Sequence, residues 1–174
     1  SEELLDPEGV FVDFKSWLHG EGIPEDLIVP KSILLAQVDS EIKRWRHGSP
    51  ADKLVTDNWS WLEWVHFLRN MHRPKNLKKI RALDDTFHFT ESGNSEILAA
   101  WLLRCIEMQY EPAYDRLDSF LGNTGRRKFI EPLYRALKES PEGKEMALDI
   151  YRRARPNYHS ISVNTIDELL GWGK

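Results

Sequence analysis

Apolar residues recur three and four positions apart along most of the chain, which is the period of a helix with one buried face. The first segment with this period begins after Lys31 and stops at Gly48. Glycine favours the position just past the end of a helix, so the pattern predicts a first helix between these two residues. Its apolar positions are Leu34, Leu35, Val38, Ile42 and Trp45.

A second segment follows Asp57 and Asn58, either of which can cap the start of a helix. Its apolar residues cover more than half of the circumference of a helix, which predicts burial on two sides. These residues are Trp61, Leu62, Trp64, Val65, Leu68 and Met71.

The clearest helix is predicted from Glu96 to about Gln109, with Asn94 as its N-terminal cap. A shorter helix follows Pro74, and the helix after Gln109 has Pro112 in its first turn. Three more helices are predicted to begin near Lys128, Pro141 and Ser160.

These segments predict an all-α fold, because the apolar and polar alternation typical of strands is almost absent. About seven helices of roughly ten to seventeen residues with short connections place neighbours antiparallel. We therefore expect a helical stack, or a short right-handed α-α superhelix of the armadillo or HEAT type, over residues 31–174. Residues 1–30 contain several prolines and glycines and are expected to be an extended connector.

The composition is that of a folded domain, since 41% of the 174 residues are apolar and 11% are aromatic. The 24 lysines and arginines and 28 aspartates and glutamates give a net charge of −4, with no general attraction to nucleic acid or an anionic membrane. No run reaches the roughly 20 apolar residues that cross a bilayer. The single cysteine, Cys105, fits a reducing compartment. We expect a cytoplasmic protein with no nucleic-acid or membrane partner.

The sequence lacks the residue sets that support catalysis. A catalytic zinc site typically uses two histidines four positions apart on a helix, and the histidines offer no such pair. They are His19, His47, His66, His72, His88 and His159. Cys105 falls on the apolar face of its helix, where thiols are mostly inert, and neither a serine elbow nor a glycine-rich phosphate loop occurs. We therefore expect neither a catalytic residue nor a metal site in this chain.

The tryptophans are interpreted as core residues, in preference to a ligand platform or an interface with a neighbouring domain. They include Trp17, Trp45, Trp59, Trp61, Trp64 and Trp101. A basic run over residues 69–81 could contact phosphates, but acidic stretches on either side favour a solvated face. Its members are Arg69, His72, Arg73, Lys75, Lys78, Lys79 and Arg81.

A basic triplet occupies residues 126–128 after a glycine-containing turn. Pro132 is expected in the first turn of the following helix, so the triplet is predicted at the helix start. Free backbone N–H groups already make that end of a helix positive, and further positive side chains oppose the helix dipole. The combined field suits an anion, and Arg126 with Lys128 could hold a carboxylate between them.

The alternative is that the triplet forms ordinary surface ion pairs. Suitable acidic neighbours in the sequence are Glu131 and Asp118. Ion pairs of this kind would leave less charge available for a ligand. The residues alone leave both interpretations open.

Four segments are recognisable through their order and spacing. They are Asp13-Phe14-Lys15-Ser16-Trp17-Leu18, Gly93-Asn94-Ser95-Glu96-Ile97, Trp101-Leu102-Leu103-Arg104-Cys105-Ile106 and Gly125-Arg126-Arg127-Lys128-Phe129-Ile130-Glu131-Pro132-Leu133-Tyr134. Together they resemble the C-terminal domain of leukotriene A4 hydrolase and related zinc aminopeptidases. The resemblance covers nearly the whole chain and is most specific between Asn94 and Tyr134.

The resemblance implies a helical domain that closes one side of the active-site cleft of a larger aminopeptidase. Zinc, its H-E-x-x-H motif and the catalytic residues would lie in a catalytic domain absent from this chain, to which residues 1–30 connect. In this family the arginine and lysine of a G-R-x-K-F segment bind the C-terminal carboxylate of a short peptide substrate, and by position these are Arg126 and Lys128. Arg127 replaces a commonly apolar residue and is an accessory candidate that could compete with Arg126 for the anion. Epoxide hydrolysis does not carry over.

The function predicted from the sequence is therefore that of a C-terminal helical domain of a zinc aminopeptidase, without activity on its own. The alternative is a stand-alone helical-repeat adaptor whose tryptophan-rich or basic face binds another protein. The sequence upstream of Ser1 separates the two, because only the first predicts a zinc-binding helix there.

Overall fold

Within residues 33–71 and 76–173, which the computed structural model describes, the chain is helical and contains no strand. The expected all-α fold is confirmed. The α-helices are α2 (Ile33–Arg46), α3 (Trp61–Asn70), α4 (Leu77–Phe87), α5 (Ser95–Glu107), α6 (Tyr114–Asn123), α7 (Arg127–Leu137), α8 (Pro141–Ala154) and α9 (Ser160–Leu170). Single 3-10 turns are η1 (Ala51–Lys53), η2 (Phe89–Glu91), η3 (Glu111–Ala113) and η4 (Arg155–Asn157). The expected connector of residues 1–30, with Trp17 and His19, lies outside the described residues, as do His72, Arg73 and Lys75.

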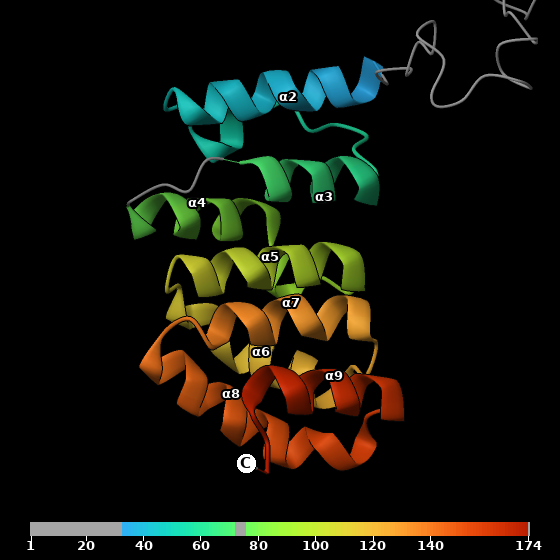
Figure 1. Ribbon diagram of the computed structural model, residues 1–174. Coiled ribbons are helices and arrows are strands. Elements are labelled where there is room, and N and C mark those ends of the chain that lie inside the picture. The colour runs from blue at the N-terminus through green and yellow to red at the C-terminus, as the bar shows by residue number, and fades with distance from the viewer. Residues whose placement is uncertain (1–32, 72–75, 174) are drawn as a thin grey trace, which may run out of the picture. The chain divides into compact units, whose positions relative to one another are not determined.

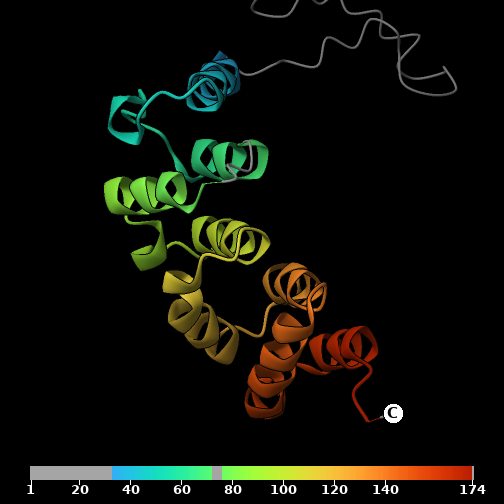
Figure 2. The same cartoon turned by 90° about the vertical axis from the view of Figure 1, so that its left-hand side faces the viewer.

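From α3 to α9 the helices alternate between two layers. In one layer α3, α5, α7 and α9 pack side by side in that order, and they run in the same direction (Figure 1). In the other layer α6 packs against α8, and α4 lies on the same side of the row as α6 (Figure 2). Because the helices of the first row are parallel, their N-terminal ends share one edge of the stack.

Capping side chains determine where two of the row helices begin. The side chain of Asn94 accepts hydrogen bonds from the N–H groups of Glu96 and Ile97, at 2.9 and 3.3 Å, and so caps α5 as predicted. The predicted caps of α3, Asp57 and Asn58, are wrong, because α3 is capped by Ser60. Ser60 precedes a glutamate at the third helical position, and the two side chains form a reciprocal capping box.

The first turn of α3 is more exposed than its apolar residues predicted. Trp61 and Leu62 are 44% and 56% exposed, whereas Val65 and Leu68 are buried. Both exposed residues are in the first turn of α3, at the edge where the row helices begin. Beyond this turn, helix α3 packs against both α2 and α5, so the predicted burial on two sides is confirmed for the rest of the helix.

Helix α7 also starts differently from the prediction. Pro132 is the sixth residue of this helix and lies in its second turn, because the helix begins at Arg127. A proline at this position lacks the N–H that would bond the carbonyl of Lys128. The basic triplet nevertheless lies at the helix start, as predicted.

The tryptophans of the described residues belong mainly to the core, as expected. Trp101 is fully buried, and its indole N–H donates to the Thr90 hydroxyl at 2.9 Å. The ring of Trp64 contacts Phe87 and Phe89, with centroid distances of 4.8 and 5.2 Å. These contacts join α3, α4 and α5, and the exposed Trp61 is the exception.

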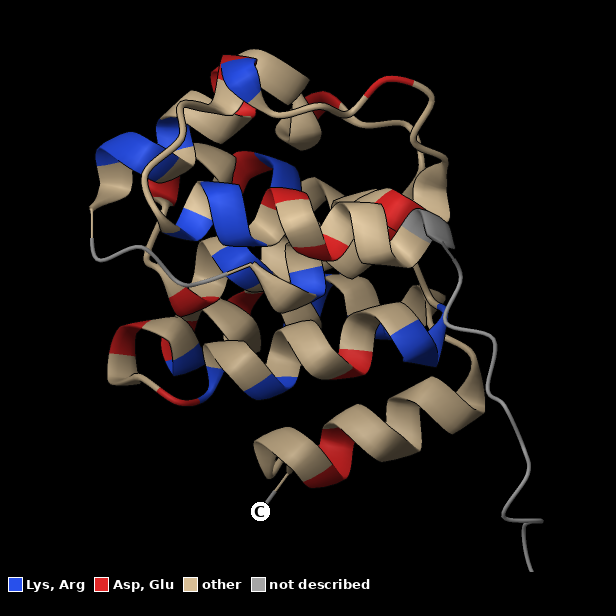
Figure 3. Ribbon diagram, turned by 90° about the horizontal axis from the view of Figure 1, so that it is seen from above, with Lys and Arg blue, Asp and Glu red and all other residues tan. Residues whose placement is uncertain are grey.

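The remaining chemical predictions concern charge and the single thiol. Basic and acidic residues are interspersed over the helices in Figure 3, and Arg69, Lys78 and Arg81 of the basic run are exposed. Cys105 is buried, and burial raises the pKa of its thiol well above the usual range, as expected for a packing group. None of the described helices is long and apolar enough to cross a membrane.

Candidate anion-binding site at the start of helix α7

Helix α7 begins with a positive end that its own residues do not neutralise. Arg126 precedes the helix with an extended backbone (φ −75°, ψ 114°), its side chain forms no cap, and the first turn contains no acidic residue. The N–H groups of Phe129 and Ile130 both donate to the Arg126 carbonyl, at 2.9 and 3.2 Å. Within the described residues, the N–H groups of Arg127 and Lys128 have no hydrogen-bond partner. A helix end of this kind attracts anions.

Two cations of the triplet meet over the ring of Phe129. The guanidinium carbon of Arg126 lies 5.6 Å from the ring centroid, and Nζ of Lys128 lies 4.6 Å from it. Both distances are within the roughly 6 Å over which a ring attracts a cation. Because Phe129 is only 6% exposed, its ring is a fixed support under Arg126 and Lys128. Arg127 is exposed, and no ring contact or ion pair joins it to the other described residues.

Among the described residues, Lys128 has an ion-pair partner and Arg126 has none. Nζ of Lys128 forms an ion pair with the carboxylate of Glu96, in the first turn of α5. Glu131 instead pairs with an arginine one turn further along α7, and Asp118 pairs with an arginine of α8. The acidic partners considered from the sequence are therefore wrong, although surface pairing does occur for Lys128. Arg126 forms no ion pair with any described residue.

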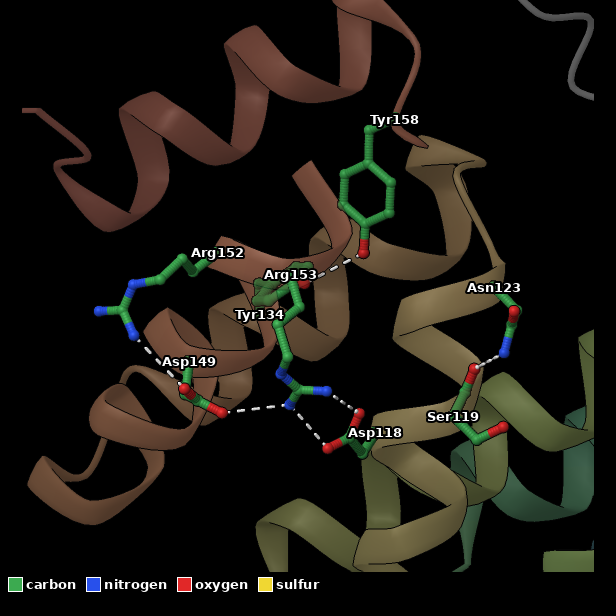
Figure 4. A network of polar contacts seen from close by, with 8 residues as sticks. All are labelled: Asp118, Ser119, Asn123, Tyr134, Asp149, Arg152, Arg153 and Tyr158. Atoms are coloured by element: carbon green, nitrogen blue, oxygen red, sulfur yellow. Dashed lines mark hydrogen bonds and ion pairs between the residues drawn. The ribbon is translucent and has the colours of Figure 1, made fainter. Parts of the chain in front are cut away.

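A network of polar contacts joins α6 and α8, the helices that precede and follow α7 (Figure 4). The guanidinium of Arg153 donates to both carboxylate oxygens of Asp118, at 3.1 and 2.8 Å, and to Asp149 at 3.1 Å. At the end of α6 the side-chain amide of Asn123 donates to the Ser119 carbonyl at 2.7 Å. The bonds of Arg153 to Asp118 join α6 to α8 within one layer, and the bond of Asn123 lies within α6.

Tyr158 and Ser162, on either side of the start of α9, form hydrogen bonds to the end of α6 and to the turn before α7. The hydroxyl of Tyr158 donates to the Leu121 carbonyl at 2.6 Å, so the hydroxyl of Tyr134, 3.0 Å away, donates to Tyr158. The hydroxyl of Ser162 donates to the Gly125 carbonyl at 2.7 Å. Tyr158 is buried, and burial raises the pKa of its hydroxyl to about 12. The residue before Arg126 is therefore anchored to another helix.

The described residues do not fit a metal site. No group of three or more histidine, cysteine, aspartate or glutamate side chains within them is arranged to hold a metal ion. His66 is instead hydrogen-bonded to Asp39, at 2.8 Å. The chemistry that this edge can supply is recognition of an anion by fixed positive charges and free N–H groups.

Comparison with known proteins settles the family. The family model described as leukotriene A4 hydrolase, C-terminal, matches residues 59–170, which include the whole candidate site. The chain belongs to the leukotriene A4 hydrolase C-terminal family. Leucine aminopeptidase 2 of Neurospora crassa is 27% identical over 92% of this chain and 24% of its own length. Aminopeptidase B of Mus musculus is 23% identical over 91% of this chain and 26% of its own length.

A solved structure shows the same fold. The native leukotriene A4 hydrolase from Saccharomyces cerevisiae matches 92% of this chain and 29% of its own, with a TM-score of 0.71 and 23% identity. The leukotriene A4 hydrolase of Xenopus laevis is 24% identical over 87% of this chain and 26% of its own length. This member of the leukotriene A4 hydrolase C-terminal family thus spans about a quarter of the length of such relatives.

The structure adds two residues to those predicted for the site. Glu96 and Phe129 belong to the recognisable segments, but the sequence analysis assigned neither of them a role. Phe129 is three residues after Arg126, a spacing at which side chains near a helix can meet, whereas the contact of its ring with the adjacent Lys128 does not follow from helical spacing. Glu96 is 32 positions from Lys128 and gives no local signal.

Proposed function

We propose that this domain forms one wall of the substrate cleft of an aminopeptidase, and that Arg126 and Lys128 bind the C-terminal carboxylate of a short peptide. The observation that carries the proposal is Arg126, an exposed guanidinium without an ion pair among the described residues, at the positive end of α7. The names of the relatives from Neurospora crassa and Mus musculus support an aminopeptidase.

The chemistry of the site suits a carboxylate. A planar guanidinium can donate two parallel hydrogen bonds to the two oxygens of a carboxylate, and an ammonium adds a compact charge beside it. The N–H groups at the start of α7 add donors that need no rearrangement. Phe129 holds Arg126 and Lys128 near one another, so less side-chain entropy is lost on binding.

Catalysis is assigned to a different part of the complete enzyme. The relatives named aminopeptidases are about four times as long as the part that this chain matches, so we assign the zinc and the catalytic residues to a separate catalytic domain. The role of this domain is to fix the far end of the peptide, which places the first peptide bond at a defined distance from the catalytic residues. Its main partner is then that catalytic domain in the same polypeptide.

The test replaces Arg126 by alanine in the complete enzyme. A charge-assisted hydrogen bond contributes about 1.5–3 kcal/mol, so kcat/KM for a tripeptide with a free carboxylate should fall roughly ten- to a hundredfold. The same tripeptide with an amidated C-terminus should lose much less. An equal loss for both substrates would overturn the proposal.

A matched control removes another exposed arginine. Arg152 lies in the last turn of α8, and its side chain is 67% exposed. Arg152→Ala removes the same charge and volume without touching the start of α7, so the ratio of the two kcat/KM values should stay at the wild-type level. A change of that ratio in Arg152→Ala would show that total charge, and not the site, determines the preference.

A further inference from the structure

The carboxylate of Glu96 lies beside Lys128 of the proposed site. Helices α5 and α7 are parallel neighbours, and their N-terminal ends meet at the edge that carries the basic triplet (Figure 1). Glu96 is the second residue of α5, and its carboxylate forms an ion pair with Nζ of Lys128. A carboxylate from the domain itself thus already contacts one of the two proposed ligand-binding cations.

The two cations differ in whether a carboxylate of the domain already binds them. Arg126 is exposed and has no ion pair within the described residues, so an incoming carboxylate can bind it directly. Lys128 is bound to Glu96, with side-chain exposures of 51% and 28%. An incoming carboxylate must share Lys128 with Glu96 or displace Glu96, and the negative charge of Glu96 opposes either arrangement.

We propose that Glu96 is an internal substitute for the substrate carboxylate: it holds Lys128 while the site is empty and releases it when a peptide binds to Arg126. This inference rests on the proposed function. Glu96 is a positioning residue, since it acts through Lys128. It keeps the lysine folded onto Phe129 and lowers the affinity of the site for a free carboxylate, which favours release of the shortened peptide, because that product keeps the C-terminal carboxylate of the substrate.

Displacement of Glu96 is energetically accessible. Exposed ion pairs contribute little to stability, because water and salt screen them and two long side chains must be held in place. A bound peptide would gain hydrogen bonds from Arg126 and from N–H groups of α7, neither of which Glu96 takes up. The pair can therefore open without disturbing the fold.

The test is Glu96→Gln in the complete enzyme, with the free-acid and amidated tripeptides as substrates. Removal of the competing charge should raise the ratio of kcat/KM for the free acid to that for the amide about two- to fivefold, mainly through a lower KM of the free acid. An unchanged or lower ratio overturns the inference. Glu142→Gln is the matched control, because Glu142 is also the second residue of its helix, α8, and the loss of a favourable helix-dipole charge is the same.

A double-mutant cycle separates a specific effect from a general one. In a Lys128→Met background, Glu96→Gln should raise the ratio by much less than in the wild type, because the glutamate acts through the lysine. An undiminished increase would contradict that. The inference fails independently of the proposed function: if Arg126→Ala abolishes the preference for a free carboxylate and Glu96→Gln does not raise it, only the role of Glu96 is wrong.

Discussion

The hydroxyl of Tyr158 donates a hydrogen bond of 2.6 Å to the carbonyl of Leu121, and this bond connects the segment before α9 with the end of α6. The same hydroxyl accepts a hydrogen bond from Tyr134, since the two hydroxyls are 3.0 Å apart. Because the chain passes from α6 to Arg126 within a few residues, the bond also fixes the start of α7.

Replacing Tyr158 by phenylalanine should destabilise the domain. The change leaves the Leu121 carbonyl and the Tyr134 hydroxyl without this buried partner, which costs about 1–3 kcal/mol. Urea denaturation followed by circular dichroism would measure the free energy of unfolding. Tyr114→Phe is the control, because the hydroxyl of the half-buried Tyr114 has no hydrogen bond to a described residue. Equal stabilities of the two variants would contradict the prediction.

Stability should decrease at alkaline pH. Burial raises the pKa of Tyr134, Tyr151 and Tyr158 above the ordinary value, to about 12 for Tyr158. Tyrosines of the unfolded chain lose their protons as the pH rises through about 10, while these folded ones keep theirs. The folded state then binds more protons, so the free energy of unfolding falls above about pH 10. Denaturation at several pH values would show this, and Tyr158→Phe should have a shallower decrease. A constant free energy up to pH 11 would be inconsistent with it.

Phe129→Leu should weaken the preference for a free carboxylate in the complete enzyme. Leucine fills much of the ring's space but has no aromatic face to attract the two cations, an interaction worth about 0.5–1 kcal/mol for each exposed cation. If both interactions are lost, the ratio of kcat/KM for the free acid to that for the amide should fall about five- to thirtyfold. Leu133→Met, a core change in the same helix, is the control. A correctly folded Phe129→Leu enzyme with an unchanged ratio would exclude a role of the ring in the site.

Cys105 should react with iodoacetamide only when the domain unfolds. Its side chain is 1% exposed, and burial keeps the thiol protonated because its pKa is raised. Labelling followed by mass spectrometry should be at least about 100-fold slower in native buffer than in concentrated urea. Rapid labelling of the native domain would mean that α5 opens locally.

Capping residues, glycines and the spacing of apolar residues in the sequence predict most of the fold. Asn94 was identified as a cap because its side chain can accept from the N–H groups two and three residues ahead, and it does so. Gly48 ends the first helical segment as predicted, and its positive φ of 102° is a conformation that glycine adopts without strain. The exposure of Trp61 was not predictable, because helical periodicity does not show where the neighbouring helices end.

The candidate site was predictable only in part. The run from Arg126 to Lys128 was placed at a helix start from its neighbours in the sequence, and the structure has it there. The partner of Lys128 depends on how α5 packs against α7, and this packing brings Glu96 to the lysine across 32 positions of the chain. The sequence points only to nearer acids, because it does not show which residues of different helices lie side by side.

The most direct measurement is a crystal structure of the complete enzyme with a non-hydrolysable tripeptide analogue. The account predicts that the carboxylate of the analogue lies about 2.7–2.9 Å from the guanidinium of Arg126, with Nζ of Lys128 turned toward it and away from Glu96. A carboxylate bound elsewhere, with Arg126 facing solvent, would contradict the proposed role of this domain.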